Sequence, residues 1–271
     1  MQTEVIFGDG SQYHDSADDL DAGELSRPCA LRSLTPVDLR CSRGAEGGDL
    51  ETDDFFVKAV GLTPEVIGQT VFNEILGNLL ARALGIRTPE PVLIEIQMDF
   101  LELLESQGIE VRPGIASGAR NLGRAISPPV FGRMSEEQLG QASAIYVFDM
   151  LVQNPDRRIE NNNCVEVDGD IVAIDFGDCF SFLLPIIGGA SDPWVADRVI
   201  SRQHIFRGTI SDEFIEETVN RIDSLTEDRL AELTAWMPAE WMEWAARVSE
   251  HILAVRNHVD EFKWEILRSL P

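Results

Sequence analysis

Residues 154–178 read NPDRRIENNNCVEVDGDIVAIDFGD and follow the apolar run AIYVFDMLVQ. Proline, asparagine and aspartate favour turns, so the first ten of these residues suit a polar surface loop. They also suit a catalytic loop, because Asp156 is followed five residues later by Asn161. Further on, the apolar run VAIDFGD predicts a strand that ends at Asp175. Either half of this pattern occurs by chance in many proteins, whereas the combination favours the catalytic interpretation.

The three side chains match the needs of phosphoryl transfer. That reaction spreads negative charge over phosphate oxygens, and its catalysis consists of positioning and charge neutralisation by Mg²⁺. One carboxylate must lie near the substrate hydroxyl, and Asp156 suits this role. Mg²⁺ prefers hard oxygen ligands, which Asn161 and Asp175 supply. A bound cation also offsets the repulsion between the two carboxylates.

The asparagine register within this loop stays open. Asn162 and Asn163 compete with Asn161 as the metal ligand, and only the five-residue spacing favours Asn161. Two arginines follow the first acid: Arg157 and Arg158 suit phosphate steering or pairing with nearby acids, and equally suit solvated charge.

A lysine and a glutamate upstream form a second candidate set. Lys58 is one of only two lysines, and it lies within the apolar strand FFVKAV. Lysine is rarely buried without a partner, and a nucleotide phosphate is a natural one. Glu74, on the helix that follows, is placed to pair with Lys58 and hold it toward the phosphates. The alternatives are a solvent-facing Lys58 at a sheet edge and a Glu74 on the exposed helix face.

A phosphate-binding loop is the weakest part of the pattern, since the chain has no G-x-G-x-x-G motif. The nearest candidate is AGELSRPCALR at residues 22–32, a Gly-Ser turn before a strand-like run. In it, the backbone N–H groups of Ser26 and Arg27 could contact phosphates.

The pattern along the chain predicts an α+β fold with two lobes. Strand-like segments at 29–34, 37–42, 53–60 and 89–96 surround a helix expected over residues 64–84, with Gly85 as its C-cap. A short helix is expected at 99–107. The Gly- and Pro-rich segment 111–129 lacks periodicity and predicts the boundary between the lobes.

Helices dominate the second half of the chain. Ser135 is the expected N-cap of the helix that precedes the loop, and Ser211 and Thr226 are expected caps further on. One long helix is expected from 238 to 270, with Trp236, Trp241, Trp244 and Trp264 packing this end of the protein. The expected division is an acidic, partly mobile segment 1–25, a small β-rich lobe 26–115 and a larger helical lobe 116–271.

Composition excludes several partners. The net charge of −25 argues against binding nucleic acid through its phosphates and against docking on anionic membranes. No apolar stretch approaches the roughly 20 residues that a membrane helix needs. Cys29, Cys41, Cys164 and Cys179 form no CxxC pair, and the expectation is idle thiols in a reducing cytoplasm.

The chain resembles the HipA-like kinases and, more distantly, the phosphatidylinositol 3/4-kinases. The resemblance rests on SRPCALR, FFVKAV, NEILGNLLARALGIRTPEPVLIE, SGARNLGRA and, most specifically, FDMLVQNPDRRIENNNCVEVDGDIVAIDFGDCF. It implies a bilobal protein-kinase-like fold that uses ATP and Mg²⁺. By this resemblance Asp156 is the catalytic base, Asn161 and Asp175 hold the metal, and Lys58 contacts the nucleotide phosphates. It also implies a hinge beside adenine around 114–123.

The expected function is therefore a serine/threonine protein kinase, with ATP and a protein substrate as its partners. Two alternatives stay open: a kinase for a lipid or small molecule, and a nucleotide-binding scaffold without turnover.

Overall fold

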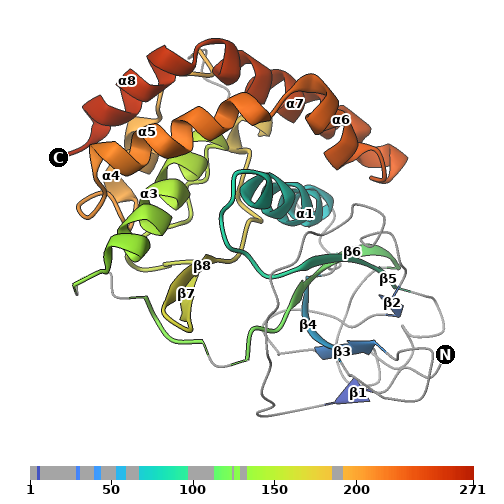
Figure 1. Ribbon diagram of the computed structural model, residues 1–271. Coiled ribbons are helices and arrows are strands. Elements are labelled where there is room, and N and C mark those ends of the chain that lie inside the picture. The colour runs from blue at the N-terminus through green and yellow to red at the C-terminus, as the bar shows by residue number, and fades with distance from the viewer. Residues whose placement is uncertain are drawn as a thin grey trace. The chain divides into compact units, whose positions relative to one another are not determined.

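The computed structural model describes residues 5–6, 29–30, 40–43, 53–58, 67–96, 113–123, 125–128, 133–184 and 192–271 (Figure 1). Ser26, Arg27 and the helix expected at 99–107 lie outside these residues, as does nearly all of the acidic segment 1–25. The chain divides into two compact units. The first comprises residues 1–75 and 89–124, and the second comprises 76–88 and 125–271.

The described part of the first unit is built on a six-stranded sheet with the order β1-β3-β4-β6-β5-β2. All neighbouring strands are antiparallel except β2 and β5, which are parallel. The strands are β1 Val5–Ile6, β2 Cys29–Ala30, β3 Arg40–Arg43, β4 Asp53–Lys58, β5 Pro91–Ile96 and β6 Gly114–Arg120. Because β4 lies between β3 and β6, Lys58 is on an interior strand and not at a sheet edge.

The segment 111–129, expected without periodic structure at the boundary between two lobes, contains an interior strand, and the first unit ends within the same segment at residue 124. Within 111–129, Gly114–Arg120 forms β6, which pairs with β4 on one side and β5 on the other. The small residues of this strand gave no strand-like pattern in the sequence. The position of the strand nevertheless requires a small residue at its centre. A β-carbon at Gly118 would lie 2.5 Å from Val92 Cγ2 and 2.6 Å from Ile94 Cδ1, so the neighbouring side chains fill the space that a larger residue would need.

Helix α1, Ile67–Ala83, has the expected type and nearly the expected bounds. The boundary between the two units falls within it, after Ile75. Its apolar stripe is buried, and so are most of the other positions from Val71 to Ala81. Gly85 ends the helix as expected, with φ +77° and its N–H donating to the carbonyl of Arg82 at 2.8 Å.

The second unit is mainly helical. Its elements are α3 Glu136–Leu151, β7 Cys164–Val167, β8 Asp170–Ala173, α4 Arg198–Gln203, α5 Asp212–Arg221, α6 Glu227–Thr234, α7 Met242–Asn257 and α8 Val259–Ser269. Three short 3-10 helices lie at Ser181–Leu183, Ile222–Ser224 and Ala239–Trp241. Helix α3 packs on α5 and on β8, and α5 packs in turn on α8 (Figure 1). No described helix has the length and apolar character needed to cross a bilayer.

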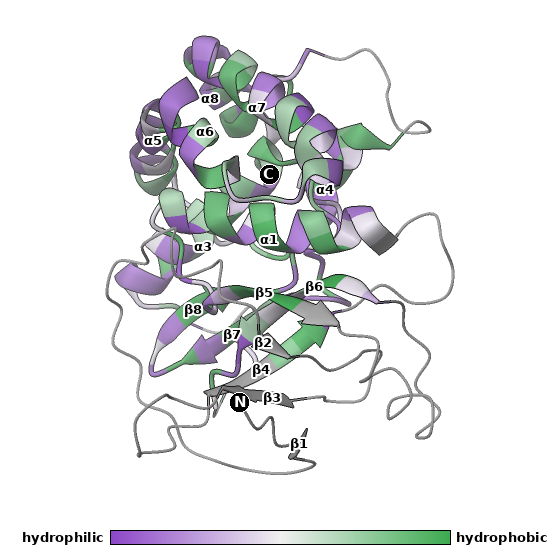
Figure 2. Cartoon of the chain, turned by 90° about the vertical axis from the view of Figure 1, so that its right-hand side faces the viewer, coloured by the Kyte–Doolittle hydropathy of each residue, from purple (hydrophilic) through white to green (hydrophobic). Residues whose placement is uncertain are grey.

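The core of this unit follows from the patterning of its helices. Helix α3 is buried from Ala142 to Leu151, and it begins with a full capping box in which Ser135 and Gln138 bond reciprocally. The outer helices are amphipathic, and in Figure 2 both hydrophilic and hydrophobic stretches appear along α6, α7 and α8. Thr226 caps α6 as expected, whereas Ser211 occupies the N-cap position of α5 without a side-chain hydrogen bond.

The single long helix expected at 238–270 is two helices. The break falls at His258, whose backbone leaves the helical region with φ −126° and ψ 38°. The His258 ring stacks on Trp194 with centroids 3.7 Å apart, a contact between distant segments that no helical periodicity could indicate. Of the tryptophans expected to pack this end, Trp241 is buried. Trp264 is 58% exposed, and its described ring contact is with the Arg268 guanidinium, which lies over it.

A buried histidine anchors α7 to α3. The His251 Nε2–H donates to the backbone carbonyl of Leu151 at 2.9 Å, and the ring stacks on Phe182. Burial lowers the pKa of His251 to about 4, although the bond to Leu151 opposes this shift. The unfolded chain therefore takes up a proton near pH 6.5 that the folded protein does not bind. Stability contributed by the neutral ring is present above pH 6.5 and is lost as the pH falls toward 4.

We expect His251→Gln to remove this pH dependence, since a glutamine amide can still donate to the Leu151 carbonyl. Between pH 7.5 and pH 5, the unfolding free energy of the wild type should fall by about 2 kcal/mol relative to that of the variant. Urea denaturation of both proteins at the two pH values measures the difference. Comparing the two proteins cancels the titration of their shared carboxylates. A difference that does not change with pH would contradict the assignment.

Candidate functional site

The loop after α3 and the β7–β8 hairpin bring the sequence-predicted acids of the second unit together. The hairpin pairs Cys164 with Ala173, so the residues just outside it, Asn163 and Ile174, face each other. The Ile174 N–H donates to the Asn163 carbonyl at 3.0 Å. Asp175 follows directly. The end of the asparagine-rich loop and the start of the Asp-Phe-Gly segment are thus held side by side by backbone pairing.

The Asp156 carboxylate is held by three side-chain donors. Asn161 Nδ2 and Asn163 Nδ2 donate to Oδ2 at 2.6 and 3.0 Å, and Arg158 Nη2 donates to Oδ1 at 3.0 Å. Its backbone N–H donates to the Asn154 Oδ1 at 3.1 Å, which fixes the start of the loop. The structure therefore brings two asparagines to the acid. Asn161 is the exposed one, and Asn163 is buried.

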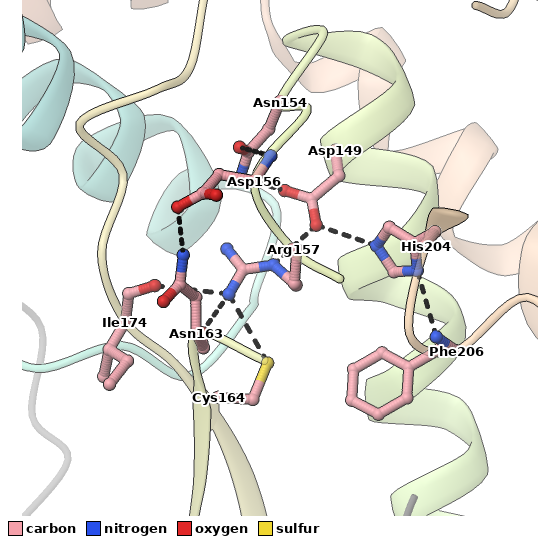
Figure 3. A network of polar contacts seen from close by, with 9 residues as sticks. All are labelled: Asp149, Asn154, Asp156, Arg157, Asn163, Cys164, Ile174, His204 and Phe206. Atoms are coloured by element: carbon pink, nitrogen blue, oxygen red, sulfur yellow. Dashed lines mark hydrogen bonds and ion pairs between the residues drawn. The ribbon is translucent and has the colours of Figure 1, made fainter. Parts of the chain in front are cut away.

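A buried ion pair lies directly behind Asp156 (Figure 3). The side chains of Arg157 and Asp149 are both fully buried, and Arg157 Nε donates to Asp149 Oδ2 at 2.5 Å. Arg157 Nη1 reaches the carbonyls of Asn163 and Ile174, the latter at 3.2 Å, and also Cys164 Sγ at 3.4 Å. One guanidinium thereby connects α3 to the start of β7 and to the residues that flank the hairpin.

Asp149 has two further donors. Asn154 Nδ2 donates to Oδ1 at 3.0 Å, and the buried His204 ring contacts Oδ2 through Nε2 at 2.9 Å. The Phe206 N–H donates to His204 Nδ1 at 3.1 Å, so Nδ1 must be the unprotonated nitrogen. The ring is therefore neutral and donates from Nε2 to Asp149. Figure 3 shows the contacts of the ring with Asp149 and Phe206.

The charges in this network follow from its geometry. Burial by itself would raise the pKa of Asp149, but Arg157 and His204 outweigh it and hold that pKa below its usual value. Burial lowers the pKa of His204 despite the neighbouring carboxylate, in agreement with the neutral ring. Burial also raises the pKa of Cys164 to about 11, so that thiol stays protonated. The network thus contains one anion and one cation, both without access to water.

Asp175 sits in a special backbone conformation. Its φ is +58°, in the left-handed region that asparagine and aspartate tolerate better than other non-glycine residues. Phe176 behind it is buried against α1 at Gly77, where a β-carbon would lie 2.8 Å from Phe176 Cβ. The absence of a side chain at Gly77 therefore allows the helix to touch the Asp-Phe-Gly segment directly.

The first unit contains the lysine–glutamate pair that the sequence indicated. Lys58 Nζ, on β4, forms an ion pair with Glu74 Oε1, on α1. The Glu74 side chain is 11% exposed, but the Lys58 side chain is 44% exposed, so this lysine is not the buried ammonium that an apolar strand suggested.

The oxygen ligands available for a metal ion are few. Among the described residues, no group of three or more His, Cys, Asp or Glu side chains could hold a cation. Asn161 uses its amide nitrogen on Asp156, and no described group donates to its Oδ1. The Asn161 amide oxygen and the Asp175 carboxylate are hard oxygen donors, and together they would make a sparse set. Such a set fits Mg²⁺, which keeps waters and takes phosphate oxygens as its remaining ligands.

The sequence analysis missed the roles of Asp149 and His204. A signal existed for the first, since Asp149 interrupts the apolar run AIYVFDMLVQ, and a charge in a buried helix calls for a buried partner. Arg157 is that partner, not a phosphate-steering or solvated side chain. No local pattern marks His204, which reaches Asp149 from 55 residues away.

Comparison with known proteins places this fold in the class of kinases. The family profile described as HipA-like kinase matches residues 49–266. The chain therefore belongs to the HipA-like kinase family, which confirms the resemblance seen in its motifs. A structure of similar fold is the crystal structure of the Helicobacter pylori proinflammatory kinase CtkA. The two have a TM-score of 0.50 and 12% sequence identity over 88% of this chain and 94% of that chain. None of the curated proteins matches the chain.

We expect Asp149→Asn to destabilise the protein strongly, because it leaves the Arg157 charge buried without a counter-ion. Breaking a buried pair in this way costs about 3–5 kcal/mol. Urea denaturation measures the change. Asp223→Asn, which makes the same substitution at an exposed position, should alter stability by less than about 0.5 kcal/mol. If Asp149→Asn cost no more than this control, the pair would not be what holds the loop.

Proposed function

We propose that the protein is an ATP- and Mg²⁺-dependent kinase that phosphorylates serine or threonine hydroxyls of a protein substrate. The observation that carries the proposal is the Asp156 carboxylate, oriented by Asn161, Asn163 and Arg158 beside the segment that leads to Asp175. Membership of a kinase family supports the general reaction. In this proposal the unit that carries the six-stranded sheet is the N-lobe and the mainly helical unit is the C-lobe. The boundary expected between residues 115 and 116 would cut β6, so it moves to the end of the first unit at residue 124.

In the proposed reaction Asp156 is the base. Its carboxylate accepts the proton of the substrate hydroxyl while that oxygen attacks the γ-phosphorus of ATP. The bond between the γ-phosphorus and the bridging oxygen breaks, and ADP leaves with the electron pair. The three donors on Asp156 hold the carboxylate in one orientation, which reduces the reorganisation that the transfer requires.

The remaining residues position ATP and its metal ion. Asn161 and Asp175 would hold Mg²⁺, which supplies charge neutralisation on the phosphates when bound. Lys58 would contact the nucleotide phosphates, and its ion pair with Glu74 restricts the lysine to fewer conformations before ATP arrives. Backbone N–H groups of Ser26 and Arg27 are the proposed further phosphate contacts.

A protein substrate is preferred to a nucleic acid or a membrane lipid because of charge. At −25 the chain repels polyanions, and the phosphate-rich surface of an inositol lipid membrane is one of these. A serine or threonine side chain on a protein carries no such penalty. Small-molecule acceptors remain as the alternative that the acceptor experiment decides.

We expect Asp156→Asn to abolish phosphoryl transfer, because an amide keeps the shape of the carboxylate but cannot take up the proton. Losing a general base costs about 10²–10⁴-fold in rate. Transfer from γ-labelled ATP measures the loss. The variant should still show the rise in Tm that ATP with Mg²⁺ gives the wild type, whereas Asp175→Asn should reduce that rise.

A matched control lies on the same hairpin. Asp168→Asn changes an exposed acid in the turn between β7 and β8, and it should leave transfer within about twofold. Normal transfer by either site variant would refute its assigned role. An ATP-induced rise in Tm with no transfer by the wild type to any acceptor, itself included, would instead indicate a nucleotide-binding scaffold.

The acceptor class can be tested by offering several hydroxyl donors together. We expect label from γ-labelled ATP to appear on casein or on the protein itself, and acid hydrolysis to release phosphoserine or phosphothreonine. Phosphatidylinositol vesicles and kanamycin, offered under the same conditions, should stay unlabelled. Label confined to either of these would contradict the protein-kinase assignment while leaving the kinase assignment intact.

A further inference from the structure

Four arginines surround a pocket of about 200 Å³ in the second unit, outside the site described above. Arg198 and Arg202 come from α4, Arg207 follows that helix, and Arg268 comes from α8. We refer to it as the arginine pocket. Such a concentration of positive charge is unexpected in a chain that carries 47 acidic side chains against 22 basic ones. Among the described residues that line the pocket, Glu265 is the one carboxylate.

Two of the four guanidinium groups have no described hydrogen-bond or ion-pair partner. Arg198 and Arg202 form no hydrogen bond or ion pair with any residue that the structure describes, and both are exposed. They are four positions apart on α4, so they share one face, where like charges repel by a few tenths of a kcal/mol. The neighbouring Asp197 accepts the N–H groups of Val199 and Ile200 as the cap of α4 and forms no described ion pair with either arginine.

Of the other two arginines, Arg207 has no described counter-ion, whereas Arg268 has one. Arg207 binds the carbonyl of Ser269 through Nε at 2.9 Å and Nη2 at 2.8 Å, a partner that carries no formal charge. Arg268 Nη2 pairs with Glu265 at 2.6 and 2.7 Å, and its guanidinium lies over the Trp264 ring. Four cations thus face one anion, and the lining has a surplus of three positive charges.

The floor of the arginine pocket is fixed by hydroxyl groups. Ser201 is buried, and its Oγ bonds to the Tyr146 hydroxyl at 2.8 Å and to the Ser269 carbonyl at 3.2 Å. The Tyr146 hydroxyl also bonds to Ser269 Oγ at 2.7 Å. These bonds connect α3, α4 and α8, so the backbones that carry the arginines are held in place before any ligand binds.

We propose that the arginine pocket binds a phosphomonoester dianion. The planar guanidinium fork matches phosphate oxygens, and several forks from different directions suit a group with three acceptor oxygens better than a carboxylate with two. A surplus of three positive charges suits a dianion. The volume equals that of several waters at about 30 Å³ each, enough for a phosphoryl group and the end of the side chain that carries it. A phosphorylated protein side chain and free inorganic phosphate share this chemistry.

Calorimetric titration of the full chain tests the proposal and separates the two sources. The probes are inorganic phosphate and the capped peptide Gly-pSer-Gly, with Gly-Ser-Gly and Gly-Glu-Gly as comparisons. All titrations are made at one ionic strength, without nucleotide and with EDTA. We expect the phosphopeptide to bind at least tenfold more tightly than either comparison peptide. Equal affinity for inorganic phosphate would support the pocket and identify the free ion as its ligand.

Variants locate the binding. The double substitution Arg198→Gln with Arg202→Gln should weaken phosphopeptide or phosphate binding at least tenfold. The matched control, Arg229→Gln with Arg256→Gln, removes the same charge from α6 and α7 and should change affinity less than twofold. Should the first pair prevent folding, Arg202→Gln alone should weaken binding at least threefold.

Three results would overturn the proposal: no binding of either phosphate probe, equal binding of the Glu peptide, or equal losses in the two double variants. None of these measurements involves ATP turnover. The proposed kinase reaction and the arginine pocket can therefore fail independently.

Discussion

The ion pair between Asp149 and Arg157 is the interaction on which the candidate site depends. It lies out of contact with water, so neither partner can be removed without leaving a charge that nothing solvates. Because Arg157 follows Asp156 directly, fixing its guanidinium also fixes the backbone that carries the proposed base. The same guanidinium donates to the carbonyl of Asn163, just before the hairpin, and to that of Ile174, just before Asp175. A buried electrostatic contact thus sets the positions of residues that work at the surface.

Much of the fold could be predicted from the sequence where local pattern and tertiary packing agree. The helix with its stripe at Val71 and Ile75 ends at Gly85 because φ there is positive, and Ser135 begins α3 because its side chain caps it. Strand β6 could not be predicted, since Gly118 at its centre is required by the side chains of Val92 and Ile94 on the next strand and not by any local pattern. Likewise, the break at His258 coincides with a ring contact to Trp194, which is far away in the sequence.

The candidate site divides in the same way. The spacing of Asp156, Asn161 and Asp175, the residues of the proposed chemistry, is local, so it could be read from the sequence alone. What holds these residues is not local. His204 reaches Asp149 across 55 residues, and its tautomer is set by an amide of the backbone. The second asparagine on Asp156 also needed the structure, because Asn163 is placed by the register of β7 and β8 and not by its distance along the chain.

The contact between Gly77 and Phe176 has a consequence for motion. Because residue 77 is glycine, α1 has no side chain at this position that could fill the space if the Phe176 ring moved away. Any departure of Phe176 would leave a cavity against bare backbone, which is costly in a close-packed interior. We therefore expect the ring and this stretch of α1 to shift together, and Asp175, the residue before Phe176, to shift with them.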